Sequence, residues 1–298
     1  MTKKPSSTIA LERRFAPSTT SVEQYLLKYF GRNPYYAMAK MVQNETTYHP
    51  VKTQLTMEAI QSHLKGSSTL GAYQLSPEDN TVLWLGWDVD SVDRETAKKF
   101  VAVITERLAG IPHAIEFSGS KGYHILVFLS APMPAEQAKL VVDFVREAGG
   151  LPKTGKSHVE CYPKQASLTK SNPMGNLLKI PLGLHPRTHN RSMFVDPQNG
   201  WEEGEEVDPL DVLANTVEPD QLIAIMKTSV DVRKQVVELL IPQWVSAAGE
   251  HHNFALHLSG YLANLGWGME DTVALIQEIA LKAGDQEVHN RVQAAEDT

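Results

Sequence analysis

The amino-acid sequence predicts an α+β protein that ends in a small all-helical region. Between residues 55 and 196, segments rich in β-forming residues are interspersed with amphipathic helical segments, in no regular βαβ order. Residues 113–118 and 123–130 form a hairpin signal, because the loop Gly-Ser-Lys-Gly joins them. From about residue 207 onward only helical patterns occur.

Each predicted element follows from local periodicity and from the residues that end it. Residues 21–41 have helical spacing that Gly31 and Pro34 interrupt, and residues 55–66, 94–110 and 134–150 read as helices that end at glycines. Strands are expected at 68–75, 81–90, 113–118, 123–130, 158–163, 176–182 and 192–196. Further helices are expected over 208–226, 230–249, 251–267 and 269–284.

Composition divides the chain into three parts. We expect a disordered leader over residues 1–20, a catalytic domain over 21–206 and a helical domain over 207–298, with an acidic connector at about 196–220. The last residues, AAEDT, carry no helix-stop signal, so we expect a longer protein of which this chain is a fragment. No apolar run has the length of a signal peptide or a membrane helix, which predicts a soluble, cytoplasmic protein.

Charge and cysteine content limit the classes of function. A net charge of −7 argues against a protein that simply coats nucleic acid. Residues 153–191 nevertheless contain seven Lys or Arg and one acid, Glu160, so this block either binds a polyanion or is an ordinary surface. The single cysteine, Cys161, excludes an internal disulfide and a cysteine-rich zinc site, and no zinc is expected.

The stretch WLGWDVDSVDR (84–94) places two acids at the end of an apolar strand. Asp88 and Asp90 alternate with one valine, so their side chains share a face and would repel each other without a cation between them. Mg²⁺ and Mn²⁺ prefer such ligands, although a strand that runs into a turn has the same pattern. Asp93 precedes a helix and is expected to be its N-cap, while Trp84 and Trp87 should lie on opposite sides of the strand.

Three later segments supply further candidates. The hairpin FSGSKGYHI suits a phosphate, because its glycine N–H groups, a hydroxyl and two cationic side chains surround one loop, although a plain turn remains the alternative. Its candidates are Ser118, Gly119, Lys121, Gly122 and His124. Glu160 is a third acid on a half-apolar strand, which either binds metal or neutralises lysines. Nucleotide or template contacts are expected at Lys179, His185 and Arg191.

The order of these motifs indicates nucleotidyl transfer by a two-metal mechanism, with acids for two metals and a hairpin for the triphosphate. A P-loop pattern does not occur in the sequence, which counts against an NTP hydrolase built on these residues.

The chain resembles the archaeo-eukaryotic primase superfamily through WDVD, SGSKGYH and the Val159–Glu160 pair. Within it, the primases of TOTE conflict systems and the CRISPR-associated primase-polymerases look most similar, through YFGRNPYYA (29–37), HLKGSSTLGAYQL (63–75), YPKQ (162–165) and GNLLKIPL (175–182). Lys179 stands where that branch is expected to have an apolar residue. The C-terminal helices resemble those attached to phage and plasmid primase-polymerases, which implies a prokaryotic, phage or plasmid origin.

The resemblance implies an RRM-like antiparallel sheet that carries the metal acids, with an N-terminal α+β unit beside it. It implies a DNA primase-polymerase that uses Mg²⁺ or Mn²⁺ at Asp88, Asp90 and Glu160. Expected partners are a single-stranded DNA template, a primer strand, NTP or dNTP, and a helicase that follows the fragment. The alternatives are a repair or end-joining polymerase that only extends primers, and a non-enzymatic module that binds an origin or single-stranded DNA.

Overall fold

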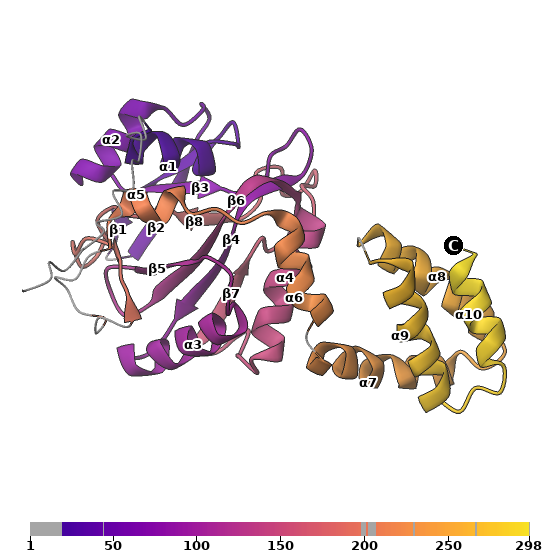
Figure 1. The fold of residues 1–298 in the computed structure, drawn as a ribbon. Helices are drawn as coiled ribbons and strands as arrows, with labels where there is room; N and C mark the ends of the chain where they lie inside the picture. The colour runs from indigo at the N-terminus through magenta and orange to yellow at the C-terminus, as the bar shows by residue number, and fades with distance from the viewer. Residues whose placement is uncertain are drawn as a thin grey trace, which may run out of the picture.

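The computed structural model describes residues 20–43, 45–197, 201, 207–228, 230–265 and 267–297. Except for its last residue, the leader expected over residues 1–20 lies outside the described residues, as do residues 198–200 and 202–206 of the acidic connector. Helices and strands are interspersed up to Phe194, and every element that the structure describes after it is a helix, so the predicted α+β class is confirmed (Figure 1).

The first sheet is four-stranded and has the order β2-β1-β3-β8. Its antiparallel strands are β1 (Tyr36–Val42), β2 (Glu45–Val51), β3 (Leu70–Tyr73) and β8 (Leu177–Lys179). The helices α1 (Val22–Phe30) and α2 (Met57–Lys65) lie beside this sheet (Figure 1). The N-terminal unit therefore takes its fourth strand from a segment about a hundred residues further along the chain than β3.

The hairpin of β1 and β2 corrects the prediction of helical spacing through residue 41. The helix ends at Phe30, where the N–H of Gly31 bonds to the carbonyl oxygen of Leu27 at 2.9 Å, and the chain continues as a strand from Tyr36. β1 pairs with β2 on one side and β3 on the other. This non-local pairing overrides the local spacing of apolar residues.

The second sheet is five-stranded and has the order β7-β4-β6-β5-β9. Its antiparallel strands are β4 (Thr81–Asp90), β5 (Ala114–Phe117), β6 (Tyr123–Pro134), β7 (His158–Tyr162) and β9 (Met193–Phe194). The helices α3 (Arg94–Arg107) and α4 (Ala135–Ala148) pack against β4 and β6. Each of these strands falls within or next to a segment predicted from the sequence.

The two tryptophans of β4 lie on opposite faces of the second sheet, as alternation predicts. Trp84 packs against Phe30 of α1, with ring centroids 5.2 Å apart, whereas the indole N–H of Trp87 donates to the carbonyl oxygen of Val142 in α4 at 3.0 Å. Asp93 is the N-cap of α3 and accepts from the N–H of Thr96 at 2.8 Å, as predicted. Side chains at Trp84, Asp88 and Asp90 therefore share the face that looks away from α4.

The C-terminal helices are α5 (Pro209–Ala214), α6 (Pro219–Thr228), α7 (Val230–Ser246), α8 (His251–Asn264), α9 (Met269–Lys282) and α10 (Val288–Glu296). Side chains of α7 to α10 form a second hydrophobic core around Trp244. The carboxylate of Asp285 holds this core together, since the indole of Trp244 and the guanidinium of Arg291 both donate to it at 3.1 Å. Among the described residues, no helix is both long and apolar enough to cross a membrane.

The change of core comes later than the boundary expected at residue 207. Leu213 of α5 and Leu222 of α6 are fully buried in the first core, and the hydroxyl of Tyr29 in α1 donates to the carbonyl oxygen of Leu213 at 3.1 Å. Val217 pairs with β6 through an isolated bridge. The acidic residues around α5 and α6 have the composition of a connector. The apolar side chains of these helices nevertheless pack into the first core and attach the segment to the sheets.

His63 of α2 is a buried link between the helix and the first sheet. Its Nδ1 accepts from the N–H of Leu70 at 3.1 Å, and its Nε2 donates to the carbonyl oxygens of Ile180 and Pro181 at 3.0 and 3.1 Å. A Cβ at Gly183 would lie 2.0 Å from the imidazole, so the ring rests directly on the glycine backbone. Burial, with the nearby Lys179, lowers the pKa of His63 to about 4.

We expect the free energy of unfolding to fall as the pH drops from 6.5 to about 4, because in that window the unfolded state protonates His63 and the folded state does not. The loss amounts to about 3 kcal/mol for a shift of this size. Urea unfolding at several pH values would measure it. His63→Gln should weaken the pH dependence, whereas His252→Gln, at an exposed histidine, should leave it unchanged.

Candidate active site

Four ionisable side chains form a row across four neighbouring strands of the second sheet. Asp88 lies opposite Glu160 of β7 and opposite His124 of β6, and His124 lies opposite Glu116 of β5. Directly opposed residues of an antiparallel sheet point to the same face. The strand register therefore brings together three predicted site residues and one that was not predicted, Glu116.

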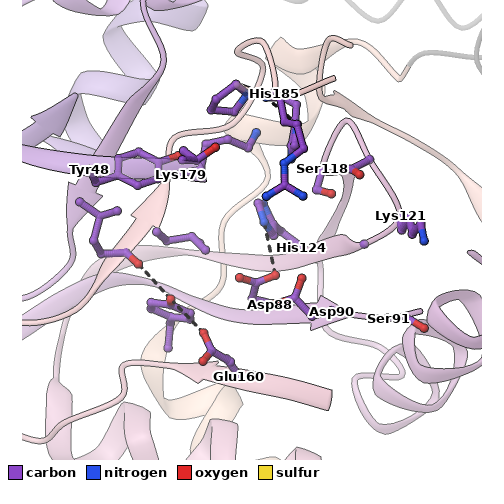
Figure 2. Close-up of a pocket in the computed structure, with 18 of the residues that line it drawn as sticks. Tyr48, Asp88, Asp90, Ser91, Ser118, Lys121, His124, Glu160, Lys179 and His185 are labelled. Atoms are coloured by element: carbon purple, nitrogen blue, oxygen red, sulfur yellow. Dashed lines mark hydrogen bonds and ion pairs between the residues drawn. The ribbon is translucent and has the colours of Figure 1, made fainter. Parts of the chain in front are cut away.

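The acidic pair of β4 is unequally exposed. The Asp88 side chain is 20% exposed, whereas that of Asp90, at the end of the strand, is 61% exposed. Burial, together with the carboxylates of Asp90 and Glu160, raises the pKa of Asp88 to about 6, although His124 and Lys164 oppose the shift. Asp88 is thus a partly buried carboxylate whose acidic neighbours and desolvation outweigh the positive charge near it, and Figure 2 shows it beside His124.

Glu160 turns its carboxylate toward a lysine. The Nζ of Lys164 lies 2.5 Å from the Oε2 of Glu160, and the hydroxyl of Tyr162 lies 3.5 Å from the same oxygen. Tyr162 also donates to the carbonyl oxygen of Leu177 at 2.9 Å, which ties β7 to the start of β8. In this conformation Glu160 is neutralised by a protein cation.

The three carboxylates fit a divalent cation in part. Asp88, Asp90 and Glu160 all line one cavity and supply the oxygen donors that Mg²⁺ and Mn²⁺ take. Within the described ranges, however, no three His, Cys, Asp or Glu side chains come together as a preformed metal site. This agrees with the way Mg²⁺ is commonly held, by one or two carboxylates and by phosphate oxygens of the substrate.

His124 and Lys179 are both held by the buried carboxylate of Glu116. The Nδ1 of His124 donates to Oε2 of Glu116 at 2.6 Å, and the Nζ of Lys179 lies 3.4 Å from Oε1. Oε1 also accepts from the N–H of Leu182 at 3.0 Å, and Lys179 donates to the hydroxyl of Ser192 at 2.7 Å. Although burial opposes the charge, Lys179 and His124 lower the pKa of Glu116 to about 2.

These side chains line a cavity of about 580 Å³ between the two sheets. Three acidic side chains lie in one part of it, where Lys164 pairs with Glu160, and other cationic or hydrogen-bond-donating groups lie in another, with His124 between them. Figure 2 shows Glu160, Asp88 and Asp90 on one side and Lys179, Tyr48 and His185 on the other. Imidazole Nε2 of His124 lies 3.5 Å from the Oδ1 of Asp88, where the two parts meet.

The hairpin loop borders the cavity through only some of its predicted residues. Ser118, Lys121 and Gly122 line it, and Gly119 does not. Gly122 packs on β4, where a Cβ would lie 2.4 Å from a carbonyl oxygen, and a Cβ on Gly119 would lie 2.7 Å from His185. The ammonium of Lys121 donates to a backbone carbonyl just beyond β4 at 2.9 Å. The glycines thus allow close approach of other parts of the protein.

Of the last two predicted contact residues, the structure places His185 at the cavity and Arg191 away from it. His185 lines the cavity, and its Nδ1 accepts from backbone N–H groups two and three residues later, so its Nε2–H remains available. Burial and the nearby Lys179 lower the pKa of His185, which favours this neutral form. Arg191 does not line the cavity; its Nη1 donates to the carbonyl oxygens of Leu64 and Leu182 at 2.7 and 2.8 Å.

Sequence reasoning missed three residues of the site. Glu116 was detectable, because it is the single charge in the apolar strand 114–117, and a buried charge needs a partner. Lys164 was visible only as a member of the YPKQ motif. Tyr48 gave no signal at all, because β2, which carries it to the cavity, was not predicted.

Comparisons with known proteins match this chain to one family model and to several solved structures. The model for the archaeo-eukaryotic primase domain of TOTE conflict systems matches residues 12–220. The comparison with curated proteins finds no match.

Three of the solved structures that match do so at low identity. The archaeo-eukaryotic primase domain of the cyanophage S-2L primase-polymerase is 13% identical, with a TM-score of 0.42 over 67% of this chain and 92% of that one. The polymerase domain of Mycobacterium tuberculosis ligase D, solved with DNA, is 17% identical, with a TM-score of 0.38 over 72% and 88%. Primase RepB′ is 9% identical, with a TM-score of 0.33 over 93% and 94%.

The family match covers well over half of the chain, and it includes both sheets, the row of ionisable residues and the cavity between the sheets. The chain therefore belongs to the archaeo-eukaryotic primase domains of TOTE conflict systems.

Proposed function

We propose that this chain is a DNA primase-polymerase, which joins nucleotides from NTP or dNTP in a template-directed, metal-dependent reaction and can also start a strand on single-stranded DNA. The observation that carries the proposal is the division of the cavity into an acidic part and a cationic part. A nucleoside triphosphate bound with divalent cations has the matching distribution of charge.

In this proposal Asp88 and Asp90 hold the cations, together with Glu160. When bound, Mg²⁺ or Mn²⁺ ions activate the attacking 3′-hydroxyl and stabilise the leaving pyrophosphate. The raised pKa of Asp88 supports the assignment, because a partly buried carboxylate with incomplete charge compensation favours a bound cation. Glu160 meets Lys164 through Oε2, so a cation would compete with the ammonium of Lys164 for this carboxylate.

The triphosphate lies against the cationic part of the cavity. His124 offers its Nε2, Lys179 has three N–H donors of which Glu116 and Ser192 use two, and His185 offers Nε2–H. Donors that are fixed before the substrate binds cost little reorganisation during the reaction. Positioning and charge stabilisation therefore supply most of the catalysis in this proposal.

Asp88→Ala combined with Asp90→Ala should abolish nucleotide incorporation, because the cations lose two ligands on one strand face. Primer extension in Mg²⁺ and in Mn²⁺ would measure the loss, and thermal unfolding would show that the fold persists. Asp93→Ala is the matched control, since it removes a neighbouring acid that only caps α3. A double variant that still extends a primer in Mn²⁺ would show that these residues do not hold the metal.

His124→Ala should raise KM for the nucleotide about tenfold or more, the effect of removing one charged hydrogen bond. The dissociation constant for template DNA should hardly change, because the imidazole faces the cavity and is buried. Steady-state kinetics and a template-binding titration would separate the two effects. Lys170→Ala, at an exposed lysine that does not line the cavity, is the control. Equal effects of His124→Ala on both constants would place His124 on the template instead.

Primer initiation distinguishes the proposal from a polymerase that only extends existing strands. On an unprimed single strand, the wild-type chain should form dinucleotides in the presence of Mg²⁺ or Mn²⁺. Extension without dinucleotide formation would favour a repair or end-joining polymerase. If the chain bound single-stranded DNA but incorporated no labelled nucleotide, a non-enzymatic replication module would be the better interpretation.

A further inference from the structure

Glu116 is the one carboxylate of the row that does not face the cavity. Its side chain is fully buried, and it is absent from the cavity lining. Its Oε2 accepts from His124, and its Oε1 accepts from the N–H of Leu182 and faces Lys179. Both oxygens are thus used by the protein, which leaves neither free for a metal ion or a substrate.

The partners of Glu116 come from both sheets. Glu116 and His124 are opposed residues of β5 and β6 in the second sheet, whereas Lys179 ends β8 of the first sheet. One carboxylate therefore sets the position of two cationic groups whose strands belong to different sheets. A salt bridge of this kind is poor evidence for stability, because desolvation of the charges offsets much of their attraction. Its geometric role is the more informative feature.

Without Glu116 the two cationic groups have other carboxylates within reach. His124 already lies 3.5 Å from Asp88 on its other side, and Lys179 lines the same cavity as Asp88 and Glu160. Lys164 is not held by Glu116, and its ammonium pairs with Glu160 in the acidic part of the cavity. The carboxylate of Glu116, at 2.6 Å from His124 Nδ1, therefore competes for His124 with Asp88, at 3.5 Å from Nε2.

We propose that Glu116 is a positioning residue, which holds His124 and Lys179 as a pair of donors for the polyphosphate of a nucleoside triphosphate and competes with the acidic residues of the cavity for both. This inference rests on the proposed function. Glu116 acts through its two partners and touches neither the substrate nor the metal.

Glu116→Gln tests the inference with an almost unchanged shape. The N–H of Leu182 and the ammonium of Lys179 both need an acceptor, so the amide oxygen stays with them and the amide NH₂ turns to His124. Nδ1 must then accept and cannot keep its proton, so His124 changes from an imidazolium to a neutral imidazole that is protonated on Nε2 alone. We expect KM for the nucleotide to rise about tenfold or more, as for loss of one charged hydrogen bond, with a smaller change in kcat and an unchanged affinity for template DNA. Glu106→Gln, at an exposed carboxylate of α3, is the control.

Because Glu116→Gln leaves the buried Lys179 without its counter-charge, a second comparison guards against a loss of folding. Lys179→Met removes the ammonium alone. The double variant Glu116→Gln with Lys179→Met removes the carboxylate as well, so neither of these two buried charges is left without its partner. If Glu116 also orients His124, the double variant should bind a non-hydrolysable nucleoside triphosphate more weakly than Lys179→Met. Equal affinities in two folded variants would contradict this part of the inference.

Imidazole ¹⁵N spectra provide a readout that is independent of activity. In histidine-labelled full chain, the His124 signals are identified by their absence in His124→Ala, and Nδ1 should change from a protonated to an unprotonated shift in Glu116→Gln. An unchanged Nδ1 signal, or an unchanged KM in a folded variant, would overturn the inference. A wild-type chain that incorporates no nucleotide with either metal would contradict the proposed function instead, and the nitrogen spectra would still decide whether Glu116 sets the imidazole.

Discussion

The register of β4 between β6 and β7 is the constraint on which the rest of the site depends. It sets Asp88 opposite both His124 and Glu160, and every other contact in the cavity builds on this row. A slip by one residue would turn Asp88 to the side of α4 and bring Trp87 to the cavity. Packing prevents the slip, because Trp84 and Trp87 are fully buried on opposite faces against different helices. Burial of large apolar side chains therefore fixes the geometry of the charged groups.

The same row shows how one fold places a buried and a partly buried carboxylate in opposite electrostatic situations. Glu116 has two cationic partners and a backbone donor, and its pKa falls to about 2. Asp88 has desolvation and two acidic neighbours, which outweigh His124 and Lys164, and its pKa rises to about 6. His124 lies between them and serves both. Glu116, whose charge is compensated, positions the groups around it. Asp88, whose charge is less well compensated, faces the cavity, where a cation or a substrate can supply positive charge.

Particular residues show how far local pattern could lead. Alternation around Val89 placed Asp88 and Asp90 on one face, and the hairpin signal located His124, because these relations depend on neighbours within one or two strands. Arg191 looked like a phosphate ligand by charge alone, but the structure uses it to join two backbone carbonyls. The strand that carries Tyr48 was not expected, since its place depends on pairing with β1.

The chain on its own specifies the α+β class, the strands that carry the acids, the capping role of Asp93 and the membership of a primase family. These properties arise from periodicity, capping and motif order, which act over a few residues. Tertiary structure alone decides that β8 delivers Lys179 from the first sheet to Glu116 in the second, that α5 and α6 belong to the first core, and that Glu160 meets Lys164. Each of these contacts depends on how the two sheets pack against each other. The free energy that selects them comes from burial across the whole core.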